Sequence, residues 1–201
     1  MIRIAATAIV LAGLASVDAP TRASAQRSKP RAGTAAAPAP FTPTSAQRER
    51  LRDMLAREGN RDTTDLARWL AEDAAPPMRA AAARSLGRIQ NRGSVPALVR
   101  ALSDPAPAVR REAAFALGLV ADTTAGPALA RRIDVETDPS TRAVLVAALG
   151  DAGGRPAAAP ALNRALRAQD PAVRRAAALA AARLRDSTLV DALASASRDA
   201  T

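Results

Sequence analysis

The chain has no histidine, no cysteine and no tyrosine among its 201 residues, and its only lysine is Lys29. Ser–His and Cys–His nucleophile pairs are therefore excluded, and so is a Ser–Lys pair in any segment beyond Lys29. Zinc and iron sites that depend on histidine or cysteine are excluded for the same reason. Carboxylates remain as the acid–base groups, and no phosphate-binding G-x-x-x-x-G-K motif occurs. We therefore expect no enzyme activity, no catalytic residue, no metal and no cofactor.

Aromatic residues are scarce as well, at 1% of the chain. Ring packing cannot form the core, so alanine and leucine must form it. Both are strong helix formers and poor strand formers, and no segment alternates apolar and polar residues over the length of a strand. The sequence thus predicts an all-α fold, in which we expect Trp69 to pack in the core or at the cap of the stack and Phe115 to pack in the core.

The net charge of +10 is unevenly distributed along the chain. Residues 1–31 carry five basic residues against one acid, whereas the remainder carries 24 arginines against 18 acids. The part that folds is therefore only mildly basic. This distribution weakens the case for a nucleic-acid-binding protein, for which a concentrated basic patch is typical.

The first 25 residues have the three parts of a secretory signal peptide. Arg3 supplies the positive charge, residues 5–17 form a short apolar run, and Ala23-Ser24-Ala25 forms an A-x-A cleavage site. The apolar run is shorter than the about 20 residues that span a bilayer, so we expect no membrane span. We predict cleavage after Ala25, a periplasmic or secreted protein, a proline-rich linker over residues 26–43, and a repeat domain over residues 44–201.

Four segments of the chain align as internal repeats. Each begins with an aspartate and carries an arginine four or six residues later, and these arginines lie 31, 32 and 32 residues apart. The aspartates are Asp73, Asp104, Asp138 and Asp170, and the arginines are Arg79, Arg110, Arg142 and Arg174.

Each segment predicts a helix with its aspartate at the N-cap, a proline at the first helical position and, in the second copy, Gly118 near the end. A second helix is expected after each, at residues 95–98, 126–129, 159–162 and 190–193. An earlier pair is expected at residues 45–57 and 64–70. These elements make five helical hairpins.

The pattern D-P-x-x-x-V-R-x-x-A-A-x-A-L-G followed by V-P-A-L-x-x-A-L resembles the HEAT-like repeat named after phycobilisome lyases. The resemblance covers residues 44–201. It implies antiparallel helix pairs stacked into a right-handed superhelix, with the second helices lining the inner, binding surface. Members of that family include scaffolds, regulators, a few lyases and DNA-repair enzymes, so the resemblance indicates a fold more than a function.

Two columns of arginine side chains are expected on the stacked repeats. The first consists of the repeat arginines, which we expect to bind the repeat aspartates or backbone carbonyls and so to hold neighbouring repeats together. The second is a set of arginines two residues after the second-helix leucines, and it is predicted to face solvent. Its members are Arg68, Arg100, Arg131 and Arg164, with Arg111, Arg132, Arg167 and Arg175 as possible extensions.

The second column has two interpretations. A guanidinium column suits carboxylates or phosphates, which it binds through paired hydrogen bonds. The other interpretation is the solvated face of an arginine-rich protein.

Asp134-Val-Glu136-Thr-Asp138 has the spacing of the first half of a calcium loop. However, Pro139 and Leu145 occupy the positions of the required glycine and glutamate, so we interpret the segment as an inter-repeat loop.

Three functions remain for such a protein. We expect an exported scaffold that holds a protein partner through its inner helical face, and its arginine column favours an acidic partner. The alternative is binding of nucleic acid or another polyanion by the arginine column, which export disfavours. The third function, a lyase of the phycobilin-lyase type, is suggested by the family name alone. We also expect some end-to-end self-association of the repeats.

Overall fold

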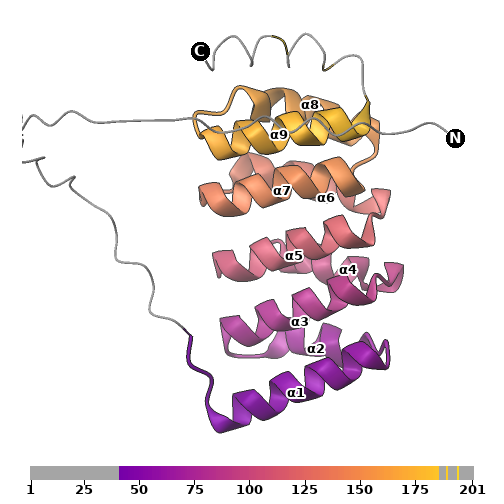
Figure 1. Ribbon diagram of the computed structural model, residues 1–201, viewed down its shortest axis with the longest axis vertical. Coiled ribbons are helices and arrows are strands. Elements are labelled where there is room, and N and C mark those ends of the chain that lie inside the picture. Colours follow the sequence, from indigo (N-terminus) through magenta and orange to yellow (C-terminus); the bar gives the residue numbers. More distant parts are fainter. Residues whose placement is uncertain (1–40, 186–188, 190–193, 195–201) are drawn as a thin grey trace, which may run out of the picture. The chain divides into compact units, whose positions relative to one another are not determined.

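A computed structural model describes residues 41–185, 189 and 194, and in this part of the chain every regular element is a helix. The α-helices are α1 (Ser45–Gly59), α2 (Thr64–Glu72), α3 (Pro76–Ile89), α4 (Val95–Ala101), α5 (Pro107–Val120), α6 (Gly126–Val135), α7 (Pro139–Ala152), α8 (Arg155–Leu166) and α9 (Pro171–Leu184). Short 3-10 turns, Arg92–Ser94 and Thr123–Ala125, precede α4 and α6. The predicted all-α solenoid of helical hairpins is confirmed (Figure 1). The signal peptide, most of the linker and the helix expected at 190–193 lie outside the described residues.

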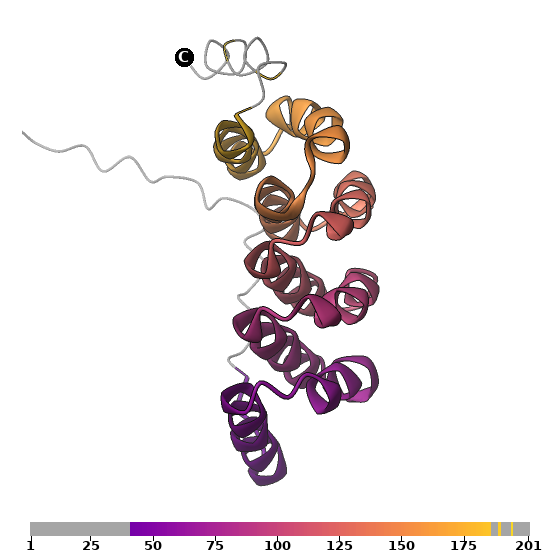
Figure 2. The same cartoon turned by 90° about the vertical axis from the view of Figure 1, so that its right-hand side faces the viewer.

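The helices form two columns (Figure 2). The first helices α1, α3, α5, α7 and α9 make up one column, and the second helices α2, α4, α6 and α8 make up the other. Neighbouring first helices from α3 to α9 pack closely along their length, whereas neighbouring second helices touch far less. Because the spacing is smaller in the first column, the stack curves toward it, and the first helices lie on the concave side (Figure 2). The expectation that second helices line the inner surface is therefore wrong.

Glycines inside the first helices explain this close spacing. A Cβ atom on Gly87 would lie 2.7 Å from Cα of Ala116, and one on Gly150 would lie 2.5 Å from Cβ of Ala180. Gly118 is less tightly placed, at 3.3 Å from Cα of Ala148. Gly118 lies within α5, which ends at Val120 with Ala121 in the left-handed conformation, so the prediction that this glycine ends the helix is wrong.

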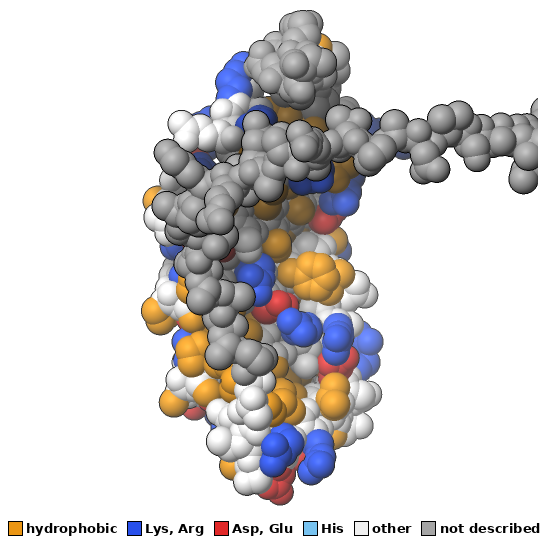
Figure 3. All heavy atoms as spheres, turned by 60° about the vertical axis from the view of Figure 1, so that its left-hand side comes forward, with side chains coloured by type: hydrophobic (Ala, Val, Ile, Leu, Met, Phe, Trp, Pro, Cys, Tyr) orange, Lys and Arg blue, Asp and Glu red, His pale blue; other side chains and the backbone are white. Residues whose placement is uncertain are grey.

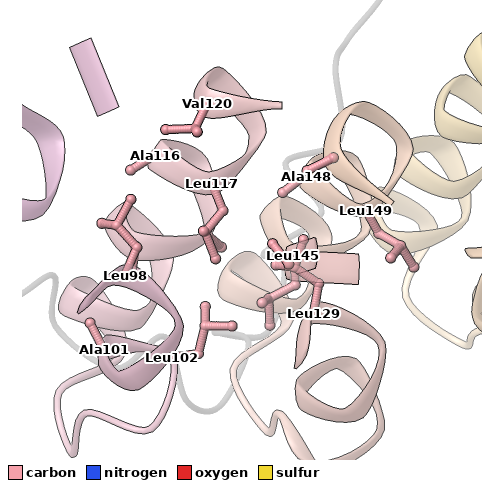
Figure 4. Close-up of a cluster of buried hydrophobic side chains, with 14 of the residues drawn as sticks. Leu98, Ala101, Leu102, Ala116, Leu117, Val120, Leu129, Leu145, Ala148 and Leu149 are labelled. Carbon is pink, nitrogen blue, oxygen red and sulfur yellow. The ribbon is translucent and has the colours of Figure 1, made fainter. Parts of the chain in front are cut away.

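The core consists of alanine and leucine from both columns, as predicted. Leu117 and Leu149 of the first helices and Leu98 and Leu129 of the second are fully buried, and alanines fill the spaces between them (Figure 4). Burying one leucine stabilises the fold by about 1.5–3 kcal/mol. Trp69 is half-buried against this core, and the guanidinium of Arg50 lies 5.9 Å from the centroid of its ring.

The first helices start at one position relative to the repeat arginine, with a proline three residues before it: Pro76, Pro107, Pro139 or Pro171. Asp138 and Asp170 are the N-cap residues of α7 and α9, as predicted. The caps of α3 and α5 are Ala75 and Ala106, so Asp73 and Asp104 lie two residues before the N-cap. The repeat aspartate thus lies six residues before the repeat arginine in the two earlier repeats and four residues before it in the two later ones. The prediction that Asp73 and Asp104 are N-cap residues is therefore wrong.

Candidate functional site

The exposed positions of the first helices differ from one repeat to the next. The position that holds Arg84 in α3 holds Phe115 in α5, Ala147 in α7 and Leu179 in α9. A buried position is more uniform, since Leu86, Leu117 and Leu149 are equivalent in α3, α5 and α7, and Ala181 takes their place in α9. One structural position of the first helices therefore carries a charged side chain in α3 and a large apolar side chain in α5 and α9.

Ion pairs join neighbouring first helices across much of this face. Arg84 in α3 donates from Nε and Nη2 to Glu112 in α5, at 3.0 and 2.8 Å. Arg183 in α9 binds Asp151 in α7 at 3.0 Å. A longer pair of 3.5 Å connects Arg88 in α3 with Glu58 in α1. Each pair is partly exposed and contributes little to stability, at most about 1 kcal/mol.

The concave face changes character between α5 and α7. Among the described residues no ion pair connects these two helices, and apolar side chains take its place in a groove of about 720 Å³. Phe115, Leu119, Ala143, Val144 and Ala147 line this groove, with Asp151 and Arg183 at one edge. Apolar side chains lie beside arginines and acids on this face, seen obliquely in Figure 3. We call this feature the α5/α7 groove.

Phe115 is the most informative side chain of the groove, because 49% of its surface is exposed. The prediction that it packs in the core is wrong. A half-exposed phenylalanine in an apolar groove has the properties of an anchor for a partner, since aromatic residues dominate the energetics of many interfaces. The sequence carries a signal for this: a position occupied by arginine in one repeat and phenylalanine in the next faces solvent.

The predicted arginine column lies on the other side of the stack. All four arginines are exposed and belong to second helices, and the column therefore lies on the convex side. Arg68 pairs with Asp65 at 2.8 Å, and Arg164 binds Asp134 at 2.9 Å. Arg100 and Arg131 line two shallow pockets.

The suggested extensions of this column do not form one patch. Arg111 and Arg175 belong to the first helices α5 and α9. Arg132 binds Glu136, and Arg167 donates to Asn163 at 2.7 Å.

Two of the four repeat arginines, Arg79 and Arg110, bind acids of the following repeat, and only the acid bound by Arg79 is one of the expected aspartates. Arg79 donates to both carboxylate oxygens of Asp104, at 2.8 and 2.9 Å. Arg110 donates in the same way to Glu136 rather than to Asp138, at 2.8 and 2.7 Å. Arg174 donates to backbone carbonyl oxygens at 168 and 169.

Asp138 and Asp170 instead accept hydrogen bonds from backbone amides at the starts of α7 and α9. The two acids therefore cap helices and do not take part in the arginine ladder.

Glu136 is the centre of the most buried of these networks, with 4% of its surface exposed. Burial by itself would raise the pKa of this carboxyl. Hydrogen bonds from Arg110, from the backbone amide of Asp138 and from Arg132 outweigh burial and lower the pKa of Glu136 to about 2. The side chain is therefore ionised at neutral pH, and its hydrogen bonds hold neighbouring repeats together.

The acids of the 134–138 segment point to separate partners: Asp134 to Arg164, Glu136 to Arg110, and Asp138 to the start of α7. No cluster of three potential metal-binding side chains occurs in the part of the chain that the structure describes. The same part contains no helix with the length and apolar character needed to cross a membrane. The three acids of this segment therefore form structural contacts.

Comparisons with known proteins agree with this geometry. The chain is similar to a solved structure of the complex of CpcE and CpcF of phycocyanin lyase from Nostoc sp. PCC7120, with 27% identity and a TM-score of 0.59 over 74% of this chain and 67% of that chain. No curated protein matches the sequence significantly. A family model for HEAT repeats matches residues 63–150 and 134–201, which together include all the hairpins from α2 onward. With the stacked hairpins and the 31- to 32-residue spacing of their arginines, this match shows that the chain belongs to the HEAT repeat family.

Proposed function

We propose that this protein is an exported, non-catalytic scaffold that holds a partner protein against the concave face of its first helices. The observation that carries the proposal is the α5/α7 groove with the half-exposed Phe115. Exposed apolar surface of this kind is costly in water and typically marks a site of association. Support for a protein partner also comes from the similar phycocyanin lyase structure, which is a complex of two proteins.

The charges around the groove favour a particular kind of partner. Arg84, Arg111 and Arg183 lie on this face, and Glu112 and Asp151 compensate two of the three. The surroundings are thus slightly positive. We expect a partner segment with a large apolar side chain flanked by acidic residues, in which burial provides affinity and the charges provide orientation.

Copurification with matched variants tests this surface. The wild-type chain and three variants are used as bait in a periplasmic extract of the native host, after circular dichroism has shown equal helix content. Phe115→Ser removes the proposed anchor, whereas Val135→Ser removes an apolar side chain of α6 that is 63% exposed. The third variant changes Arg68, Arg100, Arg131 and Arg164 to Glu.

A partner that is lost with Phe115→Ser and retained with Val135→Ser supports the groove. Loss with the arginine variant alone assigns binding to the arginine column, as the alternative of polyanion or acidic-partner binding requires. If every variant captures the same proteins as the wild type, the concave-face proposal is wrong.

Export is tested separately by fractionating the native host. We expect the periplasmic or secreted fraction to contain a chain that begins at Gln26, as determined by mass spectrometry of its N-terminal peptide. A cytoplasmic chain with residues 1–25 intact would contradict export and would favour the nucleic-acid alternative.

A lyase activity is the second candidate, and the similarity to the phycocyanin lyase complex favours it. The absence of histidine and cysteine leaves the chain without a thiol or an imidazole, so the role we expect in that case is to hold a chromophore or a partner subunit. Visible absorption of the protein purified from its native host decides between the two. A bound chromophore would favour the lyase, and a colourless protein with a bound partner would favour the scaffold.

A further inference from the structure

The ladder of repeat arginines follows a simple rule in the middle of the stack. Arg79 and Arg110 each direct Nε and Nη2 toward a carboxylate of the next repeat, and each directs Nη1 toward carbonyl oxygens five and six residues earlier. The carboxylate comes from Asp104 or Glu136, and each of these lies six residues before the repeat arginine of its own repeat. Both acids thus occupy one structural position.

Arg142 departs from this rule. The structural position that would supply its acid, six residues before Arg174, holds Ala168. Nε of Arg142 is buried and has no hydrogen-bond partner, and no ion pair joins its guanidinium to another described residue. Leaving a buried charged donor without an acceptor costs at least about as much as a lost hydrogen bond, and such groups are rare in folded proteins.

A pocket lies beside this guanidinium. It has a volume of about 250 Å³, and Arg142, Thr137, Pro139, Ala168 and Asp170 are among the residues that line it. Alanine at position 168 gives the pocket its space, because an aspartate or glutamate there would extend its carboxylate toward Nε. The missing inter-repeat acid and the unpartnered arginine therefore belong to one feature.

We propose that this pocket binds a carboxylate group from a ligand, which takes the place of the inter-repeat acid. The Nε and Nη2 edge of Arg142 offers two parallel donors, which match the two oxygens of a carboxylate. The carboxylate of Asp170 on the pocket wall accepts hydrogen bonds from the amides of Ala172 and Val173, at 2.7 and 3.2 Å. Its charge opposes a doubly charged phosphate or sulfate more than a singly charged carboxylate, so the site selects the latter.

Thermal unfolding of the full-length chain tests the proposal with acetate as the probe. The wild type is compared with Ala168→Asp, which restores the acid within the chain, and with Arg142→Gln, which removes the donor. At equal concentrations of sodium acetate and sodium chloride, we expect acetate to raise the wild-type midpoint by about 3 °C, as a roughly tenfold excess over the dissociation constant would in a domain of this size. Neither variant should show this acetate-specific rise, and Ala168→Asp should already unfold at a higher temperature in chloride.

Two further probes identify the source of the carboxylate and its charge. The blocked peptide acetyl-Gly-Asp-Gly-amide is compared with its Asn counterpart, and sodium sulfate is compared with acetate at equal ionic strength. A wild-type-specific rise with the Asp peptide that exceeds the acetate effect indicates an acidic side chain of a protein, whereas a larger effect of acetate indicates a free carboxylate. Either result supports the site. Equal shifts in all three proteins, or a wild-type-specific shift with sulfate alone, would overturn it.

Discussion

Adding a single methyl group to each of the glycines inside the first helices should have unequal effects on stability at equivalent positions. At Gly150 the new Cβ atom would lie 2.5 Å from Cβ and 2.7 Å from Cα of Ala180, and at Gly87 it would lie 2.7 Å from Cα of Ala116. Contacts this short force the helices apart, because the opposing atoms are fixed to the backbone. At Gly118 the distance of 3.3 Å to Cα of Ala148 needs a shift of only a few tenths of an ångström.

The expected changes in the free energy of unfolding follow from two opposing contributions, the cost of overpacking and the gain in helix propensity. Overpacking costs about 1–3 kcal/mol, and backbone contacts belong at the upper end of this range. Replacing glycine by alanine inside a helix gains about 1 kcal/mol. We therefore expect Gly87→Ala and Gly150→Ala to lower the free energy of unfolding by about 1–2 kcal/mol, and Gly118→Ala to leave it nearly unchanged or to raise it.

Urea unfolding followed by far-ultraviolet circular dichroism measures these differences. Gly59→Ala at the end of α1 is the control, because nothing lies within 4 Å of its added Cβ atom. In a stack whose repeats contact only their neighbours, separating α7 from α9 should also broaden the transition. If all three interior substitutions have the same effect, or if Gly118→Ala is the most destabilising, close helix approach is not the reason for these glycines.

Three other changes have defined outcomes. Glu136→Gln leaves Arg110 buried beside a neutral group and should cost about 3–5 kcal/mol in urea unfolding, whereas Asp134→Asn, in an exposed pair, should cost less than about 1 kcal/mol. Because the folded pKa of Glu136 is about 2 and the unfolded value is 4.5, its contribution of about 3 kcal/mol is complete above pH 4.5 and is lost as the pH falls toward 2. Unfolding measured across this range should show a shallower loss in Glu136→Gln. Leu117→Ala should cost about 2–5 kcal/mol because Leu117 is fully buried, and a loss as large for the half-exposed Phe115→Ala would contradict the assignment of Phe115 to the surface.

The sequence was sufficient to predict the hairpins in the part of the chain that the structure describes. Buried leucines such as Leu98 and Leu117 recur with the arginines, and helices starting near Ser45 and Thr64 extend the repeat to its degenerate first copy. These features depend on local periodicity and on which residues avoid water, and both can be read along a single chain.

The arrangement between repeats was harder to predict. Asp104 and Asp138 both precede a proline, yet the first binds Arg79 and the second caps a helix, because they stand six and four residues before their repeat arginines. If the repeats are aligned on their arginines instead, the position six residues before the arginine contains an acid in Asp104 and Glu136 and an alanine in Ala168. This alignment would have identified Glu136 as the partner of Arg110 and Ala168 as the exception. The concave side could not be inferred from the pattern either, since it depends on how closely the backbones approach at the glycines.

The glycines also bear on the recognition surface proposed above. By bringing the backbones of α3, α5, α7 and α9 close together, they make exposed side chains on the first helices converge on the concave face. The same curvature makes side chains on the second helices diverge. In addition, Arg68 and Arg164 form ion pairs with Asp65 and Asp134. Converging groups contact one partner surface together, which concentrates binding energy at the centre of an interface, whereas diverging groups meet it one at a time. The spacing that the glycines set thus favours the groove around Phe115 over the arginine column as the recognition surface.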